Sequence, residues 1–185
     1  MTRESQAKLY FLFMLADGSA SKNEKKLFDS ICRELSVDGE AKKNITSDCI
    51  KITKEMSMSC LDVIKANTTK DYVETLLRID FNKSMPKVDK ASILWNLINL
   101  GYADSHYTRE EREVVEYLRI YLGVADSIYH EMMDVAETML SLENYKTWVE
   151  ANLPDDYYKD EKLNKIEKDI KYAQKSIKLS ISEIM

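Results

Sequence analysis

The sequence predicts an all-α protein: a helical bundle in which a helix–acidic loop–helix unit occurs twice, followed by a C-terminal amphipathic helix. In 185 residues, glycine occurs only 4 times and proline only 2 times. Sheets and phosphate-binding loops need more of both, so this scarcity favours long helices joined by short links. Hydrophobic residues make up 44% of the chain and charged residues 32%. This balance allows a sizeable core with a heavily solvated outer face.

The third observation behind this prediction is an acidic segment that occurs twice in matching register. It spans residues 16–24 and again residues 103–111, each position of the second copy being numbered 87 higher. A strongly apolar stretch precedes each copy, and an apolar stripe at helical spacing follows it. We therefore expect two related helical units, at about residues 4–37 and 91–124.

The first unit is expected to begin with an apolar helix over about residues 4–16. Ser21 and Glu24 have the spacing of a capping box, in which the hydroxyl accepts a first-turn amide N–H and the carboxylate accepts the cap's own N–H. The second helix therefore starts at Ser21, and Gly39 separates it from a third. An apolar stripe indicates the third helix: Ile45, Cys49, Ile52 and Met56.

Two shorter helices are expected before the second unit. Ser59 and Asp62 offer another capping box, which predicts a short helix to about Asn67. A further helix, capped near Thr69, is predicted to run to about Phe81.

The second unit opens at Pro86, because proline fits the first turn of a helix. Its first helix is expected to reach about Ala103. Thr108 and Glu111 then repeat the capping box. The helix that they begin is expected to end at Gly123, since glycine suits the position after a helix C-terminus.

The C-terminal part of the chain has a different pattern. A long helix over about residues 126–152 is followed by Pro154, which ends it. We expect residues 1–154 to form the helical domain and residues 155–185 to form an appended helix. The apolar stripe of this last helix has coiled-coil-like spacing and includes Leu163, Ile166, Ile170 and Ile177.

That stripe has three interpretations. It packs back onto the domain, it pairs with a second copy or a different protein, or the segment is a loose helix. We take its four residues as candidate partner-binding residues, and a protein partner or homo-oligomer as the expected partner.

Charge and motifs exclude several functions. The net charge is −5 and the isoelectric point about 5.2, so the chain lacks the cationic footprint of a nucleic-acid-binding protein. It contains no nucleophile elbow, P-loop, His-Glu-x-x-His pair or glycine fingerprint. We therefore expect no enzymatic activity and assign no catalytic residue.

Three cysteines and two apolar runs bear on location. Cys32, Cys49 and Cys60 fall where helical patterns want apolar residues, as expected of reduced core thiols in a cytoplasmic protein. The alternative is a zinc site, which the 2 histidines of the chain would supply poorly. Neither apolar run before an acidic segment approaches the ~20 residues that cross a bilayer. We expect the first run to be a core helix and not a leader peptide, because its counterpart lies mid-chain. We expect a cytoplasmic protein without a transmembrane segment.

The candidate site is a set of four carboxylates in the repeated segments: Asp17, Glu24, Asp104 and Glu111. Carboxylate oxygens are ligands for Ca²⁺ or Mg²⁺, and His106 is an additional candidate that would favour Zn²⁺ or Mn²⁺. The alternative is that these residues only cap helices, where a carboxylate also interacts favourably with the positive, N-terminal end of the helix dipole.

An EF-hand is excluded by counting along each segment. If Asp17 is the first position of a calcium loop, Lys22 occupies the position that needs glycine. In the second segment, Arg109 occupies that position.

These segments resemble the TerB tellurite-resistance family. The resemblance is carried by Leu-Ala-Asp-Gly at 15–18 with Ser21-x-x-Glu24, and by Tyr-Ala-Asp at 102–104 with Thr108-x-x-Glu111 and Arg112. It covers roughly residues 4–150, and Ser105 departs from it because it replaces the glycine found at Gly18 in the first copy. Serine adopts a positive φ less readily than glycine does, so the second loop is less suited to present a backbone carbonyl from this position.

The resemblance implies an all-helical domain with an internal duplication, a domain that also occurs fused to DnaJ-type co-chaperones. It implies a non-enzymatic part of a stress response to tellurite, other oxyanions or membrane-active agents. It also implies divalent-cation binding through the matching acidic residues, and work in complexes, some of them peripheral to the membrane. The alternative functions are a purely structural helical adaptor, or an enzyme that uses the acidic loops as a metal centre.

Overall fold

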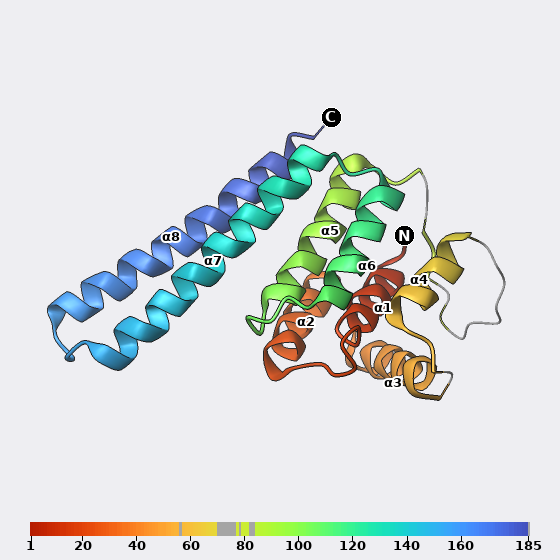
Figure 1. The fold of residues 1–185 in the computed structure, drawn as a ribbon, viewed down its shortest axis with the longest axis horizontal. Helices are drawn as coiled ribbons and strands as arrows, with labels where there is room; N and C mark the ends of the chain where they lie inside the picture. Colours follow the sequence, from red (N-terminus) through yellow and green to blue (C-terminus); the bar gives the residue numbers. More distant parts are fainter. Residues whose placement is uncertain (56, 70–76, 78, 82–83, 185) are drawn as a thin grey trace. The chain divides into compact units, whose positions relative to one another are not determined.

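The computed structural model describes residues 1–55, 57–69, 77, 79–81 and 84–184, and within them every regular element is an α-helix. The all-α prediction is confirmed for this part of the chain. The helix predicted from about Thr69 to Phe81 falls mostly on residues 70–76 and 78, outside the described residues; its predicted end is wrong, because residues 77 and 79–81 are described and are not helical. In chain order (Figure 1) the helices are α1 (Arg3–Phe13), α2 (Lys22–Glu34), α3 (Gly39–Glu55), α4 (Cys60–Thr69), α5 (Lys87–Tyr102), α6 (Arg109–Leu122), α7 (Asp126–Asn152) and α8 (Tyr157–Ser182).

The chain divides into two compact units, Met1–Gly123 and Val124–Met185. The first unit holds α1 to α6 and the second holds α7 and α8. The domain boundary expected after residue 154 falls between α7 and α8, inside the second unit, and it stays a prediction.

Two helices, α1 and α5, form the centre of the first unit. Both are apolar around most of their circumference, as is typical of helices enclosed by others. α1 contacts α2, α3, α4 and α5, and α5 also contacts α2 and α6. The Asn96 amide donates a hydrogen bond of 3.2 Å to the Tyr10 hydroxyl, which joins the two helices. Their fully buried side chains include Leu9, Leu12, Phe13, Leu94, Leu97 and Ile98.

Each central helix leads into one of the acidic segments. α1 ends at Phe13, earlier than expected from the apolar pattern. The next residues continue as tight turns, with Leu15 donating to the Leu12 carbonyl at 3.0 Å and Ala16 to the Phe13 carbonyl at 2.9 Å. The apolar pattern extends past the helix because Met14, at 1% exposure, is still buried in the core. Both acidic loops are thus held by buried helices.

The second unit is a hairpin in which α7 and α8 lie side by side and run in opposite directions (Figure 1). Its core contains Val149 from α7 with Ile166 and Ile170 from α8. Lys146 and Glu167 form an ion pair of 2.9 Å across the two helices. Partly buried residues pack around this core: Met139, Leu142, Leu153 and Leu163.

Candidate acidic site in the two capped loops

The first acidic loop (residues 17–24) is organised by side chains that bind its own backbone. The Asp17 carboxylate accepts the amide N–H of Ser19 at 3.0 Å. Ser21 donates its N–H to Oε2 of Glu24 at 2.6 Å and accepts the Glu24 N–H on its hydroxyl at 3.2 Å. The predicted capping box is confirmed. Gly18 has a φ of +96°, a conformation that glycine adopts without steric cost.

The second acidic loop (residues 104–111) repeats these contacts. Asp104 accepts the N–H of His106 at 3.0 Å, and Thr108 donates its N–H to Oε2 of Glu111 at 2.7 Å. This capping box is also confirmed. Ser105 has a φ of +68°, so the residue that replaces glycine adopts the left-handed conformation nonetheless.

His106 lies on the exposed side of this loop. Its ring Nδ1 is 2.9 Å from the carbonyl oxygen of Asp104. This contact holds the imidazole to its own loop.

Tyr107 anchors the second loop, a role that the sequence reasoning missed. Its ring is 9% exposed and packs against the ring of Tyr102, with centroids 4.8 Å apart. The Arg112 guanidinium lies 5.1 Å from the Tyr107 ring centroid. A Cβ on Gly101 would come within 2.5 Å of Cδ2 of Tyr107, so the ring fits only because position 101 is glycine. The available signal was a glycine inside an otherwise apolar helix.

The two glutamates are buried in spite of their charge. Glu24 is 3% exposed and Glu111 is 5% exposed. Burial raises the pKa of both carboxyls, and hydrogen bonds from the capping residues partly oppose the rise. The pKa of Glu111 reaches about 7.

The causes of these pKa shifts also indicate that the structure brings acids of both loops within electrostatic range of the two buried glutamates. Asp104 and Asp17 both raise the pKa of Glu24. Glu24 and Asp17 both raise the pKa of Glu111. Packing of α2 against α5 and of α5 against α6 brings the two loops together. The fold therefore gathers the negative charge of both loops into one region.

The donor atoms suit a hard cation, although they are not arranged around one. Among the residues that the structure describes, no group of three or more His, Cys, Asp or Glu side chains is placed to hold a metal ion. Among the described residues, the capping hydrogen bonds to Glu24 and Glu111 are accepted by one carboxylate oxygen of each residue, Oε2. Carboxylate oxygens are ligands for Ca²⁺ or Mg²⁺. The chemistry fits such an ion, and the assignment of these residues as ligands stays a prediction.

Two of the candidate partner-binding residues, Ile166 and Ile170, lie in the core that α8 forms with α7, and Leu163 packs against that core. Ile166, Ile170 and Ile177 are 4%, 8% and 0% exposed, and Leu163 is half-buried. Of the three interpretations of this stripe, packing against another part of the same chain is the arrangement that the structure has. Any role of these residues in binding a partner stays a prediction.

The cysteines are buried, as the sequence indicated. Burial raises the pKa of the Cys32 thiol to about 11 and that of Cys49 to about 12, and it also raises the pKa of Cys60. High thiol pKa values lower the thiolate population that reacts. In the described part of the chain, no helix has the length and apolar character needed to cross a membrane.

The comparison with protein families identifies a match over most of the chain. The model of the family "Tellurite resistance protein TerB" matches residues 3–134 of the chain. This range contains both acidic loops, and it confirms the resemblance that the sequence motifs carried. No curated protein and no solved structure gives a significant match.

Proposed function

Because the chain belongs to the TerB family of tellurite resistance proteins, we propose that it is a non-enzymatic stress-response module. In this proposal it binds a divalent cation through its two acidic loops and acts through other proteins. The burial of Glu24 and Glu111 beside further carboxylates carries the proposal.

A cation would relieve the electrostatic cost of this arrangement. Two buried carboxyls have raised pKa values; Asp17 contributes to both rises, and Asp104 contributes to that of Glu24. A bound divalent ion is the largest local charge in a site and lowers the pKa of nearby acids. Exposed Asp17 and half-buried Asp104 are the ligands that an ion arriving from solvent would meet first.

Helix capping and cation binding are compatible in this geometry. Within the described residues, each glutamate caps its helix through Oε2, and Oε1 is then the atom that binds the ion. Binding then requires the aspartate side chains to turn toward the glutamates. The choice between caps and ligands, which the sequence posed as alternatives, is therefore not exclusive.

The correspondence of the two loops supports an internal duplication. Both have an aspartate that binds the N–H two residues later, a residue with positive φ after it, and a Ser or Thr capping box with glutamate. We infer that the units at about residues 4–37 and 91–124 derive from one ancestral helix–loop–helix unit. A single site shared by the two copies follows naturally from such a pair.

The second candidate is a purely structural helical adaptor or oligomerisation protein. One observation favours it, because both glutamates already have sufficient partners in their capping boxes. In both candidates the protein is cytoplasmic, as its buried thiols suit a reducing compartment. Peripheral association with a membrane complex is proposed only for the cation-binding stress-response module.

Thermal unfolding separates the two candidates. The protein is stripped with EDTA and unfolded without ions, then with Ca²⁺, Mg²⁺, Mn²⁺ or Zn²⁺. An ion at about 100 times its dissociation constant stabilises the folded state by roughly 2.7 kcal/mol. That is enough to raise the unfolding midpoint by several degrees.

The decisive variant is Asp17→Asn with Asp104→Asn. Asparagine keeps the oxygen that accepts the loop N–H but removes the charge, so the fold is retained. A matched control is Asp38→Asn with Asp156→Asn, because these aspartates also accept backbone N–H groups, from Ala41 and Lys159. Stabilisation that survives in the control and disappears in the loop variant supports the cation module. No stabilisation by any ion supports the structural adaptor.

A further inference from the structure

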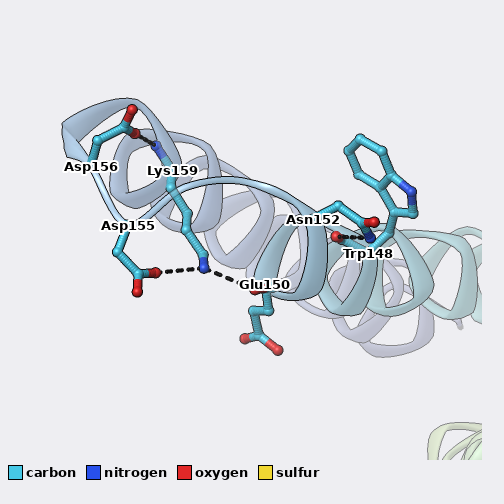
Figure 2. Close-up of polar contacts among 6 residues, drawn as sticks. All are labelled: Trp148, Glu150, Asn152, Asp155, Asp156 and Lys159. Carbon is cyan, nitrogen blue, oxygen red and sulfur yellow. Dashed lines mark hydrogen bonds and ion pairs between the residues drawn. The ribbon is translucent and has the colours of Figure 1, made fainter.

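The tip of the α7–α8 hairpin carries exposed aromatic side chains, although this hairpin already has a core. Tyr145 is 42% exposed, Trp148 is 52% exposed and Tyr158 is 56% exposed. The rings of Tyr145 and Trp148 are stacked, with centroids 6.1 Å apart and planes inclined by 14°. Figure 2 shows the Trp148 indole projecting away from the hairpin. Clustered exposed rings of this kind mark interaction surfaces.

A lysine of the same chain shows what these rings attract. Nζ of Lys162 lies 4.8 Å from the ring centroid of Tyr158 and 6.0 Å from that of Tyr145. The ammonium also donates a hydrogen bond of 3.3 Å to the Tyr145 hydroxyl. Aromatic faces attract cations through their negative quadrupole. We call Tyr145, Trp148, Tyr158 and Lys162 the hairpin-tip patch.

The segment around the patch is acidic. Residues 143–162 contain six carboxylates and three lysines. Lys159 binds the Asp155 carboxylate at 2.7 Å and the Glu150 carbonyl at 2.8 Å (Figure 2), and Lys146 pairs with Glu167. The lysines are thus engaged within the hairpin, and the carboxylates give the tip a negative field.

This combination of aromatic rings and negative charge selects the partner. A second copy would bring two acidic tips together, and an anionic lipid surface carries charge of the same sign. A cationic segment instead meets the carboxylates with opposite charge and the rings with cation–π contacts. Arginine is especially suited because its guanidinium stacks on aromatic faces.

We propose that the hairpin-tip patch is a docking surface for an arginine- and lysine-rich segment of a partner protein. The surface lies in the second unit, outside residues 3–134 that match the family. It goes beyond the cation-binding function proposed for the acidic loops, and its test is independent of any ion.

Peptide binding to the full chain tests this proposal. The probe is a fluorescein-labelled peptide of alternating arginine and serine, followed by anisotropy in EDTA, with a glutamate–serine peptide for comparison. An unlabelled arginine–serine peptide is followed by tryptophan emission. Trp148 reports on the patch, because the second tryptophan, Trp95, is only 4% exposed. We expect saturable binding of the arginine peptide alone, a change in Trp148 emission, and weaker binding as salt is added.

Two variants locate the binding site. Tyr145→Ala with Trp148→Ala should weaken binding about tenfold, because exposed aromatic residues contribute most of the energy of such surfaces. Tyr172→Ala is the matched control, since Tyr172 is 76% exposed on α8 but lies about 15 Å along the helix from Lys162. The control should bind as the wild type does. Circular dichroism checks that both variants stay helical.

A charge variant tests the second part of the argument. Asp160→Asn with Glu161→Gln should also weaken binding, whereas Asp134→Asn with Asp169→Asn, exposed acids farther along α7 and α8, should not. The proposal is overturned if the arginine peptide fails to bind, or if binding is unchanged in the aromatic variant. It is also overturned if vesicles of phosphatidylcholine, with or without phosphatidylserine, sediment the wild type but not the aromatic variant while the peptide does not bind.

Discussion

The two acidic loops make the same backbone contacts but are packed in opposite ways. The second loop inserts a large side chain, Tyr107, over a glycine of the preceding helix, Gly101. At the corresponding positions of the first loop, the loop residue is the small Ala20, and the preceding segment contributes the large, buried Met14. The large side chain is thus at the end of the helix in the first copy and in the loop in the second.

This difference separates what the loops must keep from what they exchange. Both retain the aspartate, the positive φ and the glutamate capping box, which together place carboxylates at the start of a helix. The large buried side chain belongs to the loop in one copy and to the end of the preceding helix in the other, since a core requires filled volume but not one particular donor of it. Substitutions in each loop test this separation, because they change either the packing or the capping contacts.

The largest effect is expected where the second loop depends on its glycine. Gly101→Ala places a Cβ 2.5 Å from the Tyr107 ring, so the ring must leave its position. We expect a loss of about 3 kcal/mol of unfolding free energy, measured by urea denaturation. Adding Tyr107→Ala should recover part of this loss, because the clash disappears. If the two substitutions have additive costs, the ring and the glycine are not coupled.

A second prediction concerns pH and uses the buried glutamate of the second loop. Glu111 has a pKa raised from 4.5 to about 7 in the folded state, so between these values the folded chain binds more protons than the unfolded chain. Unfolding free energy should therefore fall as pH rises through this window, on the order of 2 kcal/mol in the absence of ions. Urea denaturation at a series of pH values in EDTA measures it.

Glu111→Gln provides the comparison for this pH dependence. Glutamine also serves in a capping box, so the helix start is retained while the titrating group is removed. The variant should show a flatter profile between pH 4.5 and 7 and should be more stable than the wild type at pH 7 and above. Glu113→Gln, an exposed acid on the same helix, should leave the profile unchanged. A Glu111→Gln profile as steep as that of the wild type would contradict the assignment.

The smallest effect is expected from exchanging the residues with positive φ. Gly18→Ser should cost about 1 kcal/mol, because serine pays a steric penalty at a φ of +96°. Ser105→Gly should change stability by less than about 0.5 kcal/mol, since relief of that penalty is offset by the greater entropy of an unfolded glycine. Thermal unfolding of both variants measures these changes. Equal costs for the two would mean that the loops differ in more than this residue.

The sequence predicted those parts of the molecule that depend on local chemistry. Both capping boxes are formed as expected, and Gly123 ends α6 in the left-handed conformation with a φ of +70°. These features can be predicted from the sequence because each depends only on a residue and the backbone a few positions away. The family was also recognised from the two motifs.

The rest depends on contacts between residues far apart in the chain. The fit of Tyr107 over Gly101 and the influence of neighbouring acids on the pKa values of Glu24 and Glu111 arise only after the helices pack. The apolar stripe of the last helix has the same spacing whether it meets α7 or another protein, so periodicity alone does not choose its partner. The repeat of the acidic segment did indicate which four acids belong together.

The proposed function requires the two loops to act as one cation site, a claim that calorimetric titration of the EDTA-treated protein with Ca²⁺ and then Mg²⁺ can decide. Wild type, Asp17→Asn and Asp104→Asn are compared, with Asp38→Asn as the control. A shared site predicts a single ion per chain, with binding lost in either loop variant and retained in the control. Absence of binding in the wild type, or two ions each lost with its own loop, would contradict the claim.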